Sequence, residues 1–184
     1  QLVNARFNAQ YPEILAMIDS LGGDPFLCDL ALASFAREKL SPTASRTAII
    51  RSIIVDVLAR AASEAAQSQN EATQDEFAKA LDGLIEHMLA IDEPEPAWES
   101  VRAKLGDRAA TRLLQLGKTN RIGWVEQQFD GSYWRWKHDR LRDAIVGRRL
   151  ATLIPSLLIA NNSELVRLMR IPGAAEAGAW ALAF

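Results

Sequence analysis

The chain has 184 residues, a mass of 20.3 kDa and a formal net charge of −2. Hydrophobic residues make up 49% of it and charged residues 24%, which is typical of a globular protein and excludes a disordered one. One cysteine, Cys28, and two histidines exclude a disulfide framework and an ordinary zinc site built within this chain. No apolar run is long enough to span a membrane, and no basic segment precedes an apolar one as in a signal peptide, so we expect a cytoplasmic protein.

Charge is distributed unevenly. Residues 64–100 carry ten acids against one base, whereas residues 118–150 carry eight bases against four acids. Two solvated faces that help domains dock explain this pattern, and a nucleic-acid surface is the rarer alternative. The chain begins at Gln1 and ends inside an apolar stretch, residues 179–184, so we expect it to be part of a longer protein.

The first third of the chain predicts three helices, because apolar residues recur there at helical spacing. The first begins near Tyr11 and ends at Gly22-Gly23, where glycine favours termination. Asp24 caps the second helix, and Pro25 is its first residue, a position at which the missing N–H costs nothing. The third helix covers about 45–63.

Helices also dominate the middle of the chain. A T-x-x-E capping box at residues 73–76 precedes a fourth amphipathic helix over 77–89. Residues 92–96, with two prolines, form a loop. A short helix is predicted over 98–105, and another runs from its cap, Asp107, to Gly117.

The pattern then changes to that of a β-hairpin. The segments Ile122–Phe129 and Ser132–Lys137 are rich in aromatic and β-branched residues, and Asp130-Gly131 lies between them. Alternation along the second segment places Trp134 and Trp136 on one buried face, where they are more simply core residues than a platform for stacking bases.

Helical patterns return after the hairpin. A helix is predicted over 139–153, with Pro155 as its end. A short helix over 164–169 and a final alanine-rich helix after Pro172-Gly173 follow. Whether these last segments begin a helical repeat stays open, since two fragments establish no period.

This order of elements predicts a mainly α fold: a small helical bundle, a winged-helix domain with one β-hairpin, and the start of a C-terminal helical region. The expected domains are 1–66, 67–155 and 156–184.

Two segments carry a resemblance to a family. Residues 133–145, Tyr-Trp-Arg-Trp-Lys-His-Asp-Arg-Leu-Arg-Asp-Ala-Ile, resemble the end of the winged-helix domain in STAND-type nucleotide switches, which include NACHT proteins, NOD-like receptors and bacterial antiviral STAND proteins. An aromatic strand residue, a spacer, a histidine and a helix with an early acid recur there, and Trp136, His138 and Asp143 fit that spacing. Residues 21–27, Leu-Gly-Gly-Asp-Pro-Phe-Leu, are similar to the Gly-x-Pro turn that opens the helical domain following the ATPase core.

The resemblance implies a cytoplasmic signalling switch, used in antiviral defence or innate immunity, that is closed around ADP at rest and opens when ATP replaces it. Pro25 would contact the adenine and His138 the β-phosphate. The implied partners are a preceding ATPase core that binds ATP or ADP with Mg²⁺, a downstream sensor region, and further copies in an oligomer formed on activation. This chain alone is expected to bind no nucleotide.

Elementary chemistry is compatible with that role. A helix that begins at His138-Asp139 offers backbone N–H groups and a positive dipole end to an anion, and a neutral imidazole can still donate one hydrogen bond. The simpler alternatives are a structural histidine at position 138 and an ordinary first-turn proline at position 25.

No catalytic residues are expected in this chain, because no G-x-x-x-x-G-K-[ST] loop is present to hold phosphates. The longer protein is expected to be the ATPase. Two other functions stay open. A winged-helix DNA-binding regulator would read bases through Asp107, Arg108, Arg112 and Gln115, but the pI of 5.8 argues against it and we expect no DNA binding. A helical protein-interaction scaffold would carry no nucleotide at all.

Overall fold

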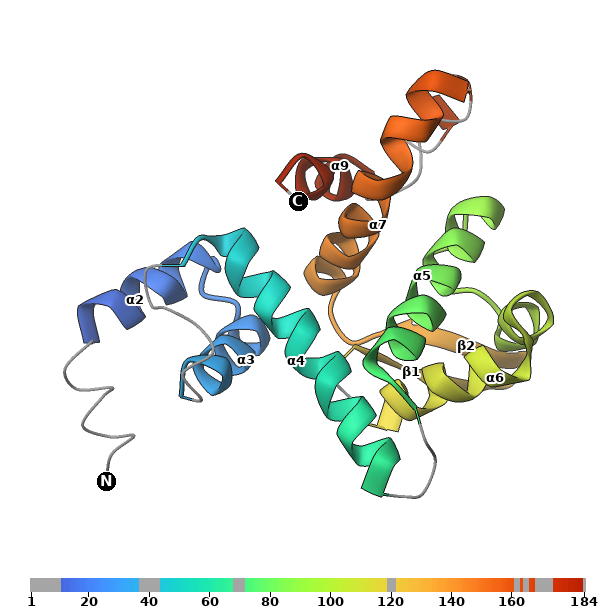
Figure 1. Cartoon of the computed structure of the whole chain (residues 1–184), viewed down its shortest axis with the longest axis horizontal. Coiled ribbons are helices and arrows are strands. Elements are labelled where there is room, and N and C mark those ends of the chain that lie inside the picture. Colours follow the sequence, from blue (N-terminus) through green and yellow to red (C-terminus); the bar gives the residue numbers. More distant parts are fainter. Residues whose placement is uncertain are drawn as a thin grey trace. The chain divides into compact units, whose positions relative to one another are not determined.

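The computed structural model describes residues 11–36, 44–67, 72–118, 122–160, 163, 166–167 and 174–183 (Figure 1). This described part holds seven helices and one two-stranded antiparallel hairpin, which confirms the predicted fold class. The elements are α2 (Tyr11–Ser20), α3 (Pro25–Ala36), α4 (Arg46–Gln67), α5 (Gln74–Ile91), α6 (Trp98–Lys118), β1 (Gly123–Gln128), β2 (Gly131–Trp136), α7 (Asp139–Ala160) and α9 (Ala174–Ala183). They form two compact units, Gln1–Asp56 and Val57–Phe184.

The first unit contains α2, α3 and the beginning of α4. Gly22 and Gly23 end α2 with φ angles of 69° and 65°, a left-handed conformation that glycine adopts without strain. The N–H of Gly23 donates to the carbonyl of Ile18 at 3.1 Å, which closes the helix end. Asp24 then caps α3 as predicted, because its Oδ1 accepts from the N–H of Leu27 at 3.1 Å. The core of this unit is aliphatic and aromatic: Ile14, Met17, Leu21, Leu27, Ala31, Phe35, Ile49, Ile50, Ile53 and Ile54.

The second unit is organised around α5 and α6, which pack against each other. Thr73 is the N-cap of α5 and accepts from the N–H of Glu76 at 3.2 Å, as the capping box predicts. Only half of the box is realised, because the Glu76 carboxylate turns to α6, where it accepts from Arg108 and Arg112. Gly106, with φ 78°, kinks α6 into the two helical segments that the sequence predicts.

The hairpin between α6 and α7 is present as predicted, with one correction. Gln128 pairs with Gly131, so the two turn residues are Phe129 and Asp130 rather than Asp130 and Gly131. The inner face is aromatic: Trp134 is fully buried and stacks on Trp98, their ring centroids 6.4 Å apart. The predicted buried face of the hairpin is therefore confirmed.

An isolated bridge also joins the hairpin to the loop between α5 and α6. Ala97 forms an antiparallel bridge with Tyr133, and the N–H of Trp134 donates to the carbonyl of Pro96 at 3.0 Å. The order is that of a winged helix: α5 comes first, then the bridging segment, then the kinked helix α6, and then the hairpin.

Helix α7 is longer than predicted: it spans Asp139–Ala160 and contains Pro155. The expectation that Pro155 ends the helix is therefore wrong: a proline removes one hydrogen bond there, but the following turn remains helical. The final alanine-rich helix is confirmed as α9, which packs closely on α7 at Gly147. The short helix predicted over 164–169 lies mostly outside the described residues.

Candidate functional site

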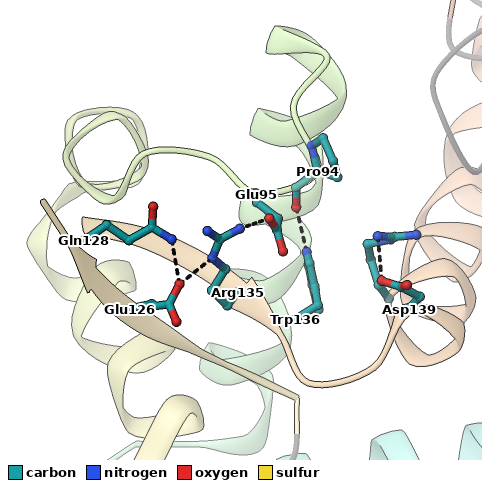
Figure 2. Close-up of polar contacts among 8 residues, drawn as sticks. Pro94, Glu95, Glu126, Gln128, Arg135, Trp136 and Asp139 are labelled. Carbon is teal, nitrogen blue, oxygen red and sulfur yellow. Dashed lines mark hydrogen bonds and ion pairs between the residues drawn. The ribbon is translucent and has the colours of Figure 1, made fainter. Parts of the chain in front are cut away.

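His138 lies between two anchored elements, β2 and α7. Just before it, the indole N–H of Trp136 donates to the carbonyl of Pro94 at 2.8 Å, and Trp136 is only 7% exposed (Figure 2). The N–H of Lys137 donates to the carbonyl of Ile122 at 2.8 Å, which holds the end of the hairpin closed. The backbone that enters His138 is therefore fixed by contacts on both sides of the hairpin.

A second set of contacts fixes the hairpin on the α5–α6 loop. Arg135 donates to the carboxylates of Glu95 and Glu126, and the distance from its Nε to Glu126 is 2.9 Å (Figure 2). Gln128 donates to the same Glu126 oxygen at 2.8 Å. Arg135 therefore links β2 to an acid of β1 and to an acid of the loop that precedes α6.

His138 is the N-cap of α7. Its carbonyl accepts from the N–H of Arg142 at 3.0 Å, and its side-chain Nδ1 accepts from the N–H of Arg140 at 3.2 Å. The ring is half-buried and lies at the terminus that carries the positive end of the helix dipole.

The charged residues after His138 pair among themselves. Arg142 donates to Asp139 at 2.9 Å, a pair that helical spacing predicts, and also to its immediate neighbour Asp143 at 2.8 Å. Further along α7, Arg148 pairs with Asp82 and Arg149 with Glu86, both on α5. These three arginines therefore tie α7 to itself and to α5.

Pro25 is the exposed first residue of α3. Asp24 and the two preceding glycines satisfy the local backbone, so the turn is complete as a helix cap. Pro25 belongs to the first unit and His138 to the second.

A cleft between α5 and α6 is the feature that sequence reasoning missed. It has a volume of about 520 Å³ and is lined by Glu76, Lys79, Ala80, Leu105, Arg108, Ala109 and Arg112. Burial raises the pKa of the Glu76 carboxyl, but the hydrogen bonds and charges of Arg108 and Arg112 outweigh it and leave that pKa below its usual value. The capping-box pattern assigns Glu76 to its own helix end, so the pattern hides its long-range partners.

A histidine–serine contact was also missed. His87 on α5 is 6% exposed, and its Nε2 lies 2.8 Å from the hydroxyl oxygen of Ser100 on α6. Burial lowers the pKa of His87, the charge of Lys104 adds to this, and Glu93 opposes it. A buried, neutral histidine bonded across two packed helices serves to join them.

The residues expected to read DNA are engaged within the molecule. Arg112 is 6% exposed and donates to Glu76 and to Gln115, and Arg108 donates to Glu76 as well. Asp107 accepts from Arg102 at 3.1 Å. Both arginines of the segment that would enter a major groove are thus paired with the Glu76 carboxylate.

Among the described residues, no three His, Cys, Asp or Glu side chains come together as a metal site. No described helix combines the length and the apolar character that a bilayer crossing requires. Comparison of the chain with protein-family models, curated proteins and solved structures found no match.

Proposed function

We propose that this chain is the regulatory helical and winged-helix part of a STAND-type ATP/ADP-controlled signalling switch, and that it stabilises the closed, ADP-bound state. The observation that carries the proposal is the position of His138. It caps α7 directly after a hairpin that is anchored on both sides, so the imidazole lies at the start of a helix. A phosphate at this terminus would meet the imidazole of His138 and a favourable dipole.

A switch needs a contact that differs between its two states, because a ligand shifts an equilibrium only by its differential affinity. The proposed contact joins His138 to the β-phosphate of ADP held by a preceding ATPase core, with Pro25 against the adenine. Opening separates the winged helix from the core and removes the histidine's donor. ATP, Mg²⁺ and hydrolysis belong to that core, and the catalytic residues lie there.

The paired arginines favour this proposal over a DNA-binding regulator. A duplex-binding surface needs several lysines or arginines that can neutralise phosphates, and Arg108 and Arg112 already share the Glu76 carboxylate. A salt titration with duplex DNA tests this alternative directly. Tight binding that weakens steeply with salt would support the DNA-binding function instead.

The decisive experiment separates the phosphate contact from the helix cap. In the longer protein that carries this chain, His138→Asp keeps an N-cap acceptor at a helix start but removes the donor and adds a negative charge. His138→Ala removes both functions. One charge-assisted hydrogen bond is worth about 1.5–3 kcal/mol, so the closed-to-open ratio should fall roughly 10- to 100-fold in either variant.

The measurements are the ADP content after purification, the thermal unfolding midpoint, and the oligomer size without a trigger. We expect His138→Asp to lose ADP and assemble without the trigger while its unfolding midpoint stays near that of the wild type. A variant that keeps ADP and stays silent would leave His138 with a capping role alone. Gln127→Ala, at an exposed position on the same hairpin, is the matched control and should retain ADP.

A further inference from the structure

The chain contains two Asp-Gly pairs, Asp82-Gly83 and Asp130-Gly131. Aspartate before glycine is prone to rearrangement, because glycine has no side chain to hinder the approach of its own nitrogen. That nitrogen can attack the side-chain carbonyl carbon, Cγ, of the aspartate and close a five-membered imide. The reaction requires a backbone that lets the two atoms come within bonding distance. The two pairs have the same chemistry, so the structure around each decides whether it reacts.

Asp130-Gly131 lies at the turn of the hairpin. Both turn residues, Phe129 and Asp130, are exposed. Gly131 is the first residue of β2, and its pairing with Gln128 is the last of the ladder, so this pair can open while the rest of the hairpin stays formed. The Asp130 carboxylate accepts from the hydroxyl of Tyr133 at 3.2 Å, an exposed bond for which water competes. The two reacting atoms therefore have room to approach each other.

Asp82-Gly83 lies in the interior of α5. The helical backbone holds the nitrogen of Gly83 in the hydrogen-bond ladder and away from Cγ of Asp82. The Asp82 carboxylate pairs with Arg148 on α7, and a Cβ at Gly83 would lie 2.8 Å from Cδ2 of Leu105 on α6. This segment is therefore packed on two neighbouring helices, and imide formation there requires local unfolding of α5.

We propose that Asp130 is a site of spontaneous isoaspartate formation in the folded chain, and that the fold protects Asp82. In the first step, the Gly131 nitrogen bonds to Cγ of Asp130, and the amide proton leaves with the carboxyl hydroxyl as water. In the second step, water adds to the main-chain carbonyl carbon of the imide, breaks its bond to the nitrogen and returns the proton. The main chain then runs through Cγ, and the former main-chain carbonyl is a free carboxylate.

The product changes the turn of the hairpin. One methylene enters the main chain between Phe129 and Gly131, and the carboxylate moves onto the backbone, so Tyr133 loses its present acceptor. The change stays at the tip, because Arg135 and Trp136 anchor the other end of β2. An enzyme that methylates isoaspartyl carboxylates is the class of partner that this product fits. The reaction needs no nucleotide, and it holds whether or not the chain belongs to a switch.

Ageing of the purified 184-residue chain tests the proposal. The chain is incubated for several weeks in mildly acidic buffer, folded in one sample and denatured by guanidinium chloride in another. Peptide mapping by mass spectrometry detects the imide by its loss of one water, and transfer of a labelled methyl group by an L-isoaspartyl methyltransferase measures isoaspartate in each peptide. In the folded chain, we expect Asp130 to convert at least about tenfold faster than Asp82, which corresponds to about 1.4 kcal/mol or more for opening α5. In the denatured chain, the two should convert at comparable rates.

One substitution made at each pair provides the matched control. Asp130→Glu keeps the charge but would have to close a larger ring, so methyl labelling of the folded chain should disappear. Asp82→Glu should leave that labelling unchanged, and circular dichroism checks the fold of both variants. A folded chain that keeps Asp130 intact while the denatured chain converts it would overturn the proposal. Conversion of Asp82 and Asp130 at the same rate in the folded chain would overturn it as well.

Discussion

Two glycines inside helices predict opposite effects when each is replaced by alanine. In a helix interior, glycine is about 1 kcal/mol less favourable than alanine, so both replacements gain roughly that amount from the backbone. The difference arises from what the added methyl group meets. At Gly83 on α5, it meets Cδ2 of Leu105 at 2.8 Å, the far end of a flexible side chain. At Gly147 on α7, it meets α9 itself.

The geometry at Gly147 sets the magnitude. A Cβ there would lie 2.4 Å from Cβ of Trp180 and 2.6 Å from the carbonyl oxygen of Ala177. Carbon atoms pack at about 3.5–4.0 Å, so α9 would have to retreat by about 1 Å or more. Forced expansion of a packed contact costs about 1–3 kcal/mol, which offsets the gain from the backbone or exceeds it. Ala177 and Trp180, both buried, lose their packing as a result.

We therefore expect Gly83→Ala to stabilise the chain by up to about 1 kcal/mol, or about 2–4 °C in the unfolding midpoint. Gly147→Ala should leave the midpoint unchanged or lower it, and should raise amide hydrogen exchange within 174–183. The measurements are thermal denaturation followed by circular dichroism and hydrogen exchange by mass spectrometry. If Gly147→Ala stabilises as much as Gly83→Ala while α9 stays protected, the inferred close packing of α7 and α9 is wrong.

Three further outcomes follow from the second unit. The folded pKa of His87 lies below its ordinary value of 6.5. The stability that this residue contributes is therefore present above about pH 6.5 and is lost as the pH falls through the folded pKa. His87→Gln should flatten this part of a stability–pH curve measured by urea denaturation. The folded pKa of Glu76 lies below 4.5, so the stability it contributes is present above that pH and is lost in more acidic solution, and Glu76→Gln should weaken that acid-induced loss in the same titrations. Trp136→Phe removes the donor to Pro94 and should cost about 1–3 kcal/mol in the free energy of unfolding, and an unchanged value would show that the contact contributes little.

Local signals predicted most of the fold, because local chemistry decides it. The side chains of Asp24 and Thr73 cap helices by accepting from N–H groups three residues later, and both caps can be predicted from the sequence. The aromatic alternation at Trp134 and Trp136 likewise identifies a strand with one buried face. Errors arose where two local signals competed. Asp130-Gly131 is a common turn pair, yet the register places Gly131 in β2.

The candidate site was harder to predict from the sequence, because its geometry depends on residues far apart in the chain. His138 stood out by its spacing from Trp136, but the Pro94 carbonyl that anchors Trp136 lies 42 residues away. Glu76 and Arg112 are 36 residues apart, and no pattern in a single sequence links them. The cleft between α5 and α6 follows from that packing and from the kink at Gly106, so it became apparent only in three dimensions.

The long reach from Pro94 to Trp136 affects how the chain is made. On a ribosome that adds about 5–20 residues per second, Pro94 emerges roughly 2–8 seconds before its partner 42 residues later. During that interval α6 is synthesised while the hairpin is still incomplete, and Trp98 lacks the ring of Trp134 that covers it. Nascent chains of this length expose apolar surface that chaperones bind, and slower decoding between residues 98 and 134 prolongs that exposure.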